Sequence, residues 1–182
     1  MLILAIDTST PTLVTGLVRD GVTVSERILP KCREQEERLV PCVQECLAEV
    51  DATFQDVTAI VVGCGPGPFT GLRVGMATAA AFGDALGIPV HGVCSLDAIA
   101  ARIDASTVLV TTDARRREVY WAWYQDGRRV EGPGVQSPSE SFPQAHMVNV
   151  PEHLADKLSI EGAQRVDLDP SPASLAAVAD LD

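Results

Sequence analysis

Short apolar runs and amphipathic stretches alternate along the first half of the chain. Continuous apolar runs bounded by turn residues are typical of buried strands, whereas apolar residues at offsets of three and four are typical of helices. This pattern predicts strands and helices in the order β-β-β-α-β-α-β-α. The predicted strands are 2–7, 13–19, 22–29, 59–63 and 90–93, and the predicted helices are 36–50, 71–86 and 95–104.

The second half begins with the same pattern, because the predicted strands 107–112, 118–124 and 128–131 repeat the opening β-β-β order. The Asp126-Gly127 turn joins the last two of these strands, as Asp20-Gly21 joins the corresponding strands of the first half. Asp-Gly between apolar runs is a strong hairpin signal, since glycine tolerates the positive φ of a tight turn. In each half this turn follows the strand-ending aspartate by thirteen residues, which predicts a duplicated β-β-β-α-β-α unit.

Beyond Gly132 the pattern weakens; it predicts a loop over 132–143, strands over 145–150 and 164–168, and helices over 152–159 and 172–179. Two such units in tandem match the α/β architecture of the actin/hexokinase/Hsp70-like (ribonuclease H-like) fold. We therefore expect an N-terminal actin-like subdomain over 1–104 and a C-terminal one over 105–182. In that fold the cleft between the halves binds nucleotide, but a fold-level analogy does not fix a function.

The charge balance excludes one class of direct partner. The 182 residues include 14 basic and 25 acidic side chains, which give a formal net charge of −11. Nucleic-acid affinity comes largely from Lys and Arg on phosphates, so we expect this chain alone to bind RNA or DNA poorly. The sequence has no apolar run long enough to span a membrane and no basic leader, so we expect a cytoplasmic protein without a signal peptide.

The five cysteines include no Cys-x-x-Cys pair, which favours reduced thiols. Cys42 and Cys46 lie four residues apart on a predicted helix, but no neighbouring His or Cys completes a metal site, so we expect no metal.

Asp7-Thr8-Ser9 follows the first predicted strand. Hydroxyls and backbone N–H groups in such a turn can hold a phosphate, and a carboxylate can hold Mg²⁺ through water. The three residues are therefore weak candidates for a nucleotide or phosphate site. An Asx-type turn that simply ends a strand is the other interpretation.

The Gly-rich run 63–73 precedes a predicted helix and could present N–H groups to an anion. It lacks the Gly-Lys-Ser/Thr ending of a P-loop, and Pro66 and Pro68 remove two donors, so a tight strand-to-helix crossover explains it equally well. We expect Thr70 to cap the helix.

One face of that helix carries almost no side chains, because Gly71, Gly75, Ala79 and Gly83 recur at steps of four. Glycine inside a helix costs about 1 kcal/mol relative to alanine, so the stripe indicates close approach of another backbone. The pattern leaves open whether that backbone belongs to this chain or to a partner.

Familiar catalytic motifs are missing from the sequence. His91, His146 and His153 form no His-Glu-x-x-His motif, and there is no Gly-x-Ser-x-Gly elbow. The basic run 115–117 is either a solvated turn or a contact for an acidic partner or a phosphate.

Five segments, covering about residues 1–125, together resemble the bacterial TsaB (YeaZ) family, in a variant similar to its actinobacterial members. They are Ile6-Asp7-Thr8-Ser9, Glu37-Arg38-Leu39 with Pro41, the run from Gly63 to Gly75, Cys94-Ser95-Leu96-Asp97-Ala98, and Asp113-Ala114-Arg115-Arg116 with Glu118-Val119-Tyr120.

This resemblance implies a non-catalytic, cytoplasmic partner of TsaD, which transfers a threonylcarbamoyl group to the adenosine beside the anticodon of tRNAs that read A-starting codons. It implies a heterodimer with the TsaD-type subunit, a TsaE-type ATPase in a larger complex, self-association through the same surface, and tRNA contact only through the complex. It implies no cofactor of the chain's own, and leaves open a nucleotide at a complex interface.

In the family, the first two helices pair with TsaD in a four-helix bundle. The resemblance therefore assigns the Gly-lined face to a partner. The partner-binding residues that it implies are Glu37, Leu39, Val43, Gly71, Leu72, Arg73, Gly75, Ala79 and Gly83.

Two features depart from the family pattern. Gln35 stands where many relatives have a histidine, which argues against a role for a histidine there. Many relatives also continue past this length, so we expect the C-terminal subdomain to be shortened.

Three alternatives remain at this stage. An ATPase or sugar kinase fits the fold, but 7–13 contains no basic residue to hold a γ-phosphate. A metallopeptidase-like protein would need the paired histidines of TsaD-like enzymes, and 95–104 contains none. Direct docking of tRNA conflicts with the charge.

Overall fold

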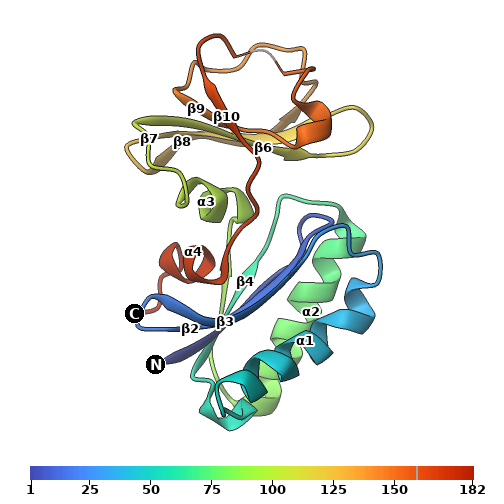
Figure 1. The fold of residues 1–182 in the computed structure, drawn as a ribbon, viewed down its shortest axis with the longest axis vertical. Helices are drawn as coiled ribbons and strands as arrows, with labels where there is room; N and C mark the ends of the chain where they lie inside the picture. Colours follow the sequence, from blue (N-terminus) through green and yellow to red (C-terminus); the bar gives the residue numbers. More distant parts are fainter. Residues whose placement is uncertain (159) are drawn as a thin grey trace.

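The computed structural model describes residues 1–158 and 160–182, which form two five-stranded sheets (Figure 1). The first sheet has the order β3-β2-β1-β4-β5, with β1 antiparallel to β2 and parallel to β4. Its strands are β1 (Leu2–Asp7), β2 (Leu13–Arg19), β3 (Val22–Leu29), β4 (Ala59–Gly63) and β5 (Val90–Val93), each with the predicted bounds.

The second sheet has the equivalent order β8-β7-β6-β9-β10, again with one antiparallel and one parallel neighbour for its first strand. Because the two sheets share one topology, the predicted duplication and actin-like fold class are confirmed. The strands are β6 (Thr107–Asp113), β7 (Val119–Gln125), β8 (Arg128–Gln136), β9 (Met147–Asn149) and β10 (Gln164–Val166).

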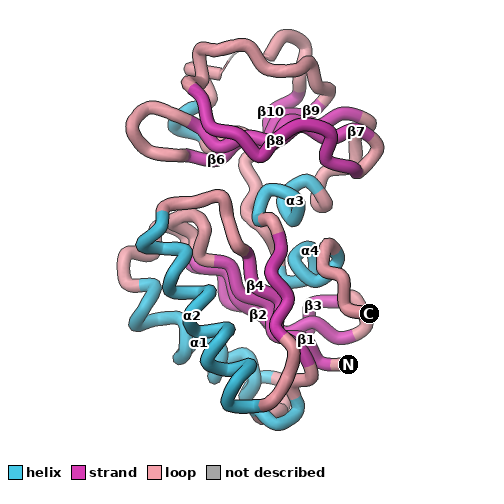
Figure 2. Tube along the Cα trace, turned by 180° about the vertical axis from the view of Figure 1, so that it is seen from behind, coloured by secondary structure: helices cyan, strands magenta, loops and turns pink. Residues whose placement is uncertain are grey.

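Two long helices cover the outer face of the first sheet: α1 (Gln35–Glu49) and α2 (Phe69–Leu86). The shorter helices α3 (Ser95–Ala100) and α4 (Pro172–Ala177) lie between the sheets (Figures 1 and 2). They are exchanged: α3 follows the first sheet but packs on β6 and β7, and α4 follows the second sheet but packs on β1 and β2. Within the described residues, no helix is long and apolar enough to cross a membrane.

The exchange of helices shows which positions of the two halves correspond. Ile3 and Ala5 face α4, and Val108 and Val110 face α3. By this alignment Thr112 lies on the face that corresponds to the face of Asp7. Asp113 nevertheless ends β6 as predicted, and its Oδ1 accepts from the Arg115 N–H at 2.8 Å, as Asp7 Oδ1 accepts from the Ser9 N–H. The Thr112 hydroxyl is buried and has no hydrogen-bond partner among the residues that the structure describes.

The weaker second-half predictions are only partly right. The strand β8 continues to Gln136 and so includes the first part of what was predicted as the loop 132–143. The predicted helix 152–159 is a single 3-10 turn, Glu152–Leu154; its last predicted residue, Ser159, lies outside the described part. The outer face of this sheet is instead covered by side chains such as Phe142, Leu154 and Leu158, because a loop stands where the first half has α1.

Thr70 does not cap α2, because the helix begins at Phe69, two residues before its predicted start, and Pro68 is the N-cap residue. Pro41 lies in the second turn of α1, so it removes one intrahelical hydrogen bond.

The small-residue face of α2 packs against the chain's own sheet. A Cβ on Gly75 would lie 2.7 Å from Thr8 Oγ1 and 3.2 Å from Ile6 Cγ2, and one on Gly83 would overlap Val90. Ala79 is fully buried in the same core. This decides the alternative that the sequence left open: the close backbone belongs to this chain.

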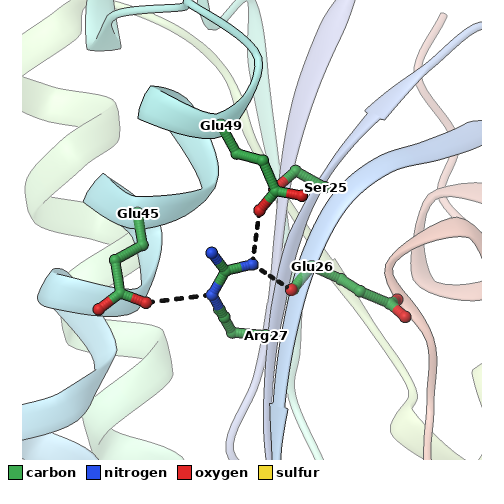
Figure 3. A network of polar contacts seen from close by, with 5 residues as sticks. All are labelled: Ser25, Glu26, Arg27, Glu45 and Glu49. Carbon is green, nitrogen blue, oxygen red and sulfur yellow. Dashed lines mark hydrogen bonds and ion pairs between the residues drawn. The ribbon is translucent and has the colours of Figure 1, made fainter.

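A polar network fastens α1 to the edge strand β3 (Figure 3). The Arg27 guanidinium donates to Glu45 at 3.0 Å and to Glu49 at 2.7 Å, while Ser25 Oγ donates to Glu49 at 3.2 Å. Because both glutamates are about half exposed, water screens these ion pairs and we assign them an orienting role rather than a large share of the stability.

The inward face of α2 generates a stability prediction. Gly75→Leu should overpack the contact with β1 and cost about 1–3 kcal/mol, so the thermal midpoint should fall. Ala77→Leu is the matched control, because Ala77 is exposed on the opposite side of the same helix. Its midpoint should stay close to that of the wild type. Thermal unfolding followed by circular dichroism measures both; equal midpoints for the two variants would contradict the packing described here.

Candidate functional site

The carboxyl end of β1 leads into a buried polar cluster. The Asp7 Oδ1 atom accepts from the Ser9 backbone N–H at 2.8 Å and from Ser9 Oγ at 2.6 Å, and Asp7 Oδ2 accepts from Ser95 Oγ at 2.6 Å. The Asp7, Thr8 and Ser9 side chains are each almost completely buried. Burial raises the pKa of Asp7 above its ordinary 3.8, an effect that the hydrogen bonds from Ser9 and Ser95 only partly oppose.

Thr8 uses its hydroxyl to hold the neighbouring helix. Its Oγ1 atom donates to the Gly71 carbonyl at 2.7 Å and accepts from the Gly75 N–H at 3.0 Å. All three side chains are engaged in hydrogen bonds inside the chain, and the nucleotide or phosphate site at Asp7, Thr8 and Ser9 stays a prediction. The bond from the Ser9 N–H to Asp7 is the Asx-type turn of the other interpretation.

The cluster also positions the Gly-rich loop. Ser95 Oγ, which donates to Asp7, accepts from the Gly65 N–H at 3.1 Å, and the Ser95 N–H donates to the Gly65 carbonyl at 2.8 Å. A Cβ on Gly63 would overlap Asp7 Oδ2, so glycine is required there. The run 63–68 is therefore a crossover fastened to the first turn of α3.

A pocket of about 540 Å³ lies beside this cluster, where four segments meet. Its walls are the β1–β2 turn, the connection before α1 with the first turn of α1, the first turns of α2, and Arg115 from the β6–β7 turn. The pocket is thus built by both halves of the duplicated fold.

The outer face of α2 is the second exposed feature. Phe69 is 75% exposed and Met76 is 42% exposed, and the Arg73 guanidinium lies 5.5 Å from the centre of the Phe69 ring. The other exposed residues along this face are mostly small: Ala77, Ala80 and Ala81. The outer face of α1 is polar by contrast, with exposed Glu37, Arg38 and Glu45.

The predicted partner-binding residues divide into two groups. Glu37 and Arg73 are exposed and Leu72 is partly exposed, so these three can meet a partner. The others are buried or turned inward: Leu39, Val43, Gly75, Ala79 and Gly83 are buried in the chain, and a Cβ on Gly71 would lie 2.9 Å from the Thr8 carbonyl oxygen. For these six the prediction of partner contact is corrected, because intrachain packing already uses them.

Sequence reasoning missed Phe69, Met76, Ala77, Ala80 and Ala81. The helical period would have found them as the face opposite the glycine stripe, once that stripe is placed against the sheet. Residue patterns alone do not say which of two apolar faces turns inward.

No group of three or more His, Cys, Asp or Glu side chains arranged to hold a metal occurs within 1–158 and 160–182. His153 Nε2 lies 2.8 Å from Asp113 Oδ2, but this pair is exposed. His146 Nδ1 contacts the hydroxyls of Ser106 and Thr107, which ties β6 to the segment before β9.

The family model for TsaD, tRNA N6-adenosine threonylcarbamoyltransferase, matches residues 25–165. An uncharacterised protein of Mycobacterium leprae is 53% identical over 160 residues, which cover 85% of this chain but only 44% of that relative. The tRNA threonylcarbamoyladenosine biosynthesis protein TsaB of Haemophilus influenzae is 31% identical over 173 residues, which cover 90% of this chain and 70% of the relative.

The solved structure of YeaZ from Pseudomonas aeruginosa superposes with a TM-score of 0.83 at 27% identity, over 97% of this chain and 89% of that one. The fold and the polar cluster thus define a duplicated actin-like protein in which the side chains of the turn after β1 are engaged in internal hydrogen bonds. Together with the sequence relatives, they show that the chain belongs to the TsaB family.

The raised pKa of Asp7 predicts how stability depends on pH. The folded chain holds the Asp7 proton more tightly than the unfolded chain, so the stability from that proton is complete below pH 3.8 and is lost as the pH rises through the higher folded-state pKa. The free energy of unfolding of the wild type, relative to Asp7→Asn, should therefore fall across that window and be level on either side.

Urea unfolding at a series of pH values measures this difference. Burial also raises the pKa of Asp169, and the charge of Asp7 adds to that shift, so both proteins also carry Asp169→Asn and the comparison isolates Asp7. A difference that is flat from pH 3 to pH 8 would be inconsistent with an uncompensated burial of this carboxyl group.

Proposed function

We propose that this chain is the non-catalytic partner of a TsaD-type transferase in the formation of threonylcarbamoyladenosine beside the anticodon of tRNAs that read A-starting codons. The family membership supports the reaction, because curated TsaB relatives carry that biosynthetic name. The chain spans 44% of one mycobacterial relative, so the proposal concerns this segment's part in the complex.

The outer face of α2 is the observation that carries the proposal. Burying a phenylalanine or methionine side chain contributes about 1.5–3 kcal/mol, and Phe69 and Met76 leave much of that area in water. The exposed alanines that follow Met76 along the helix allow a second helix to approach closely. A helical partner that covers this face accounts for an apolar surface that the chain's own fold leaves open, and Arg73 and Glu37 supply charges at its edges.

The chemistry of the chain supports a non-catalytic role. The Asp7, Thr8 and Ser9 side chains, which an actin-like ATPase or sugar kinase would direct at phosphate and Mg²⁺, are committed to internal hydrogen bonds. A metallopeptidase-like activity would need a histidine pair on the helix after β5, and α3 contains no histidine. The proposal needs no cofactor bound to this chain.

The wider assembly is part of the same proposal. A TsaE-type ATPase would join after the heterodimer forms, and copies of this chain would pair through α2 only when the TsaD-type subunit is absent. With a net charge of −11, the chain would meet tRNA in the cytoplasm through the complex and not alone.

Reconstitution tests the proposal directly. The purified chain, the TsaD-type subunit, the TsaE-type ATPase and a TsaC-type enzyme that supplies threonylcarbamoyl-adenylate are incubated with unmodified tRNA, and the modified nucleoside is measured by mass spectrometry. Omission of this chain should abolish the product. Full product without it, or product from this chain without the TsaD-type subunit, would refute the assignment.

If the outer face of α2 binds the TsaD-type subunit, a charge placed on it should selectively weaken that binding. Met76→Glu places a charge in the middle of the face on a residue that favours helix, so the variant should fold but bind the TsaD-type subunit at least about tenfold more weakly. Val135→Glu, at a 54% exposed position in β8, is the matched control and should bind normally. Surface plasmon resonance measures both affinities; equal affinities would remove α2 from the interface.

The charge predicts the behaviour toward tRNA. At physiological salt, micromolar concentrations of the isolated chain should not shift labelled tRNA in a gel, whereas addition of the TsaD-type subunit should produce a shift. A shift with the isolated chain would contradict this prediction and support direct binding of tRNA by this chain.

A further inference from the structure

Two of the five cysteines line one open pocket. Cys64 and Cys94 border a pocket of about 460 Å³, together with residues of the edge strand β8. Cys64 is exposed and Cys94 is partly exposed, so both can meet a small reagent from solvent. Cys42 and Cys46 are buried, and Cys32 lines the other pocket. Among the five cysteines, all of which the structure describes, Cys64 and Cys94 are therefore the pair that shares an open surface.

The register of the first sheet places these two cysteines side by side. Gly63 at the end of β4 pairs with Val93 at the end of the parallel strand β5. Cys64 and Cys94 follow these two residues and therefore take the next opposite positions. The Cys64 N–H donates to the Val93 carbonyl at 2.7 Å, so the hydrogen bonding continues past the strand ends. Neighbouring strands lie about 4.8 Å apart, which is within the Cα–Cα range of about 4.4–6.8 Å that a disulfide spans.

The Cys64 thiol lies on the face of β5 that Cys94 shares. A Cβ built on Gly92 would lie 2.7 Å from Cys64 Sγ, so the sulfur atom occupies the space that Gly92 leaves without a side chain. Gly92 and Cys94 are two residues apart on extended backbone, so their side-chain positions are on the same face. The Cys64 thiol donates to the Val62 carbonyl at 3.6 Å, and a rotation about its Cα–Cβ bond exchanges this weak contact for the sulfur of Cys94.

We propose that Cys64 and Cys94 are a site of reversible thiol oxidation, at which the two cysteines form a disulfide. The co-reactant is the disulfide of a low-molecular-weight thiol. The exposed Cys64 thiolate attacks one sulfur of that disulfide, forms a mixed disulfide and releases one thiol. The Cys94 thiolate then attacks the Cys64 sulfur and releases the second thiol. The two cysteines are oxidised, the co-reactant is reduced to two thiols, and the two protons that leave the cysteines end on these thiols.

The disulfide would connect two segments that lead into helices. Cys64 begins the crossover to α2, and Cys94 is the N-cap residue of α3, which packs on the second sheet. The ring closed by the link would run over residues 64–94 and contain all of α2 and β5. Such a link restricts the unfolded chain, so the thermal midpoint should rise on oxidation. The inference does not rest on the proposed partnership with a TsaD-type subunit.

Oxidation of the full chain tests the proposal. The reduced protein is incubated with millimolar oxidised glutathione at about pH 8, because burial raises the pKa of both thiols and the thiolate is the reacting form. Digestion after Asp and Glu separates Cys64 from Cys42 and Cys46, and mass spectrometry without reductant should find Cys64 linked to Cys94 within one chain. The thermal midpoint should rise by about 5 °C or more and return to its starting value after reduction with dithiothreitol.

Cys64→Ser and Cys94→Ser should each abolish the link and the rise in midpoint, and leave the remaining cysteine as a mixed disulfide with glutathione. Both variants should fold, because Cys64 is exposed and serine is a favoured N-cap residue in place of Cys94. Cys32→Ser is the matched control: Cys32 is also partly exposed but lines the other pocket, so this variant should form the link as the wild type does. Mixed disulfides without the link, a link through Cys32 or between two chains, or an unchanged midpoint would each overturn the proposal.

Discussion

The packing of α2 against the first sheet is the contact on which the other features of the structure depend. Gly75 and Gly83 leave no room for even a Cβ, so the helix lies as close to β1 and β5 as its backbone allows. Each glycine costs the helix about 1 kcal/mol in propensity, which the packing against the sheet must offset. Since one face of α2 is fixed against the sheet in this way, the opposite face, with Phe69, Met76 and the alanines, must turn outward.

The polar cluster at the end of β1 is hydrogen-bonded to the same helix. Thr8 bonds to Gly71 and Gly75 of α2, and Asp7 reaches the Gly-rich loop through Ser95. A carboxyl group that sits near Mg²⁺ and phosphate in nucleotide-binding members of this fold class here holds the strand, the loop and α3 together. The second half repeats the turn itself, because Asp113 Oδ1 accepts from the Arg115 N–H, but the buried Thr112 hydroxyl beside it finds no partner in the described residues.

The two exposed features meet at the start of α2. Phe69 and Thr70 begin the helix; the first lies on the apolar outer face and the second on the wall of the pocket beside the polar cluster. The pocket also lies between the two halves, because Arg115 lines it from the second half. The first turn of α2 therefore borders both the pocket and the exposed outer face of the helix.

The strands of the first sheet, the two long helices and the duplication follow from the sequence, because they depend on apolar periodicity and on turn residues such as Asp20-Gly21 that act locally. The sequence also showed that Gly71, Gly75, Ala79 and Gly83 share a helical face. It left open what that face meets, and the family resemblance placed Leu39, Val43 and the stripe at an interface, although Leu39, Val43, Gly75, Ala79 and Gly83 are buried in the chain. Only the tertiary structure decided this, along with the approach of Arg115 to the pocket at the starts of α1 and α2, because contacts between distant segments depend on how the two sheets and their exchanged helices pack.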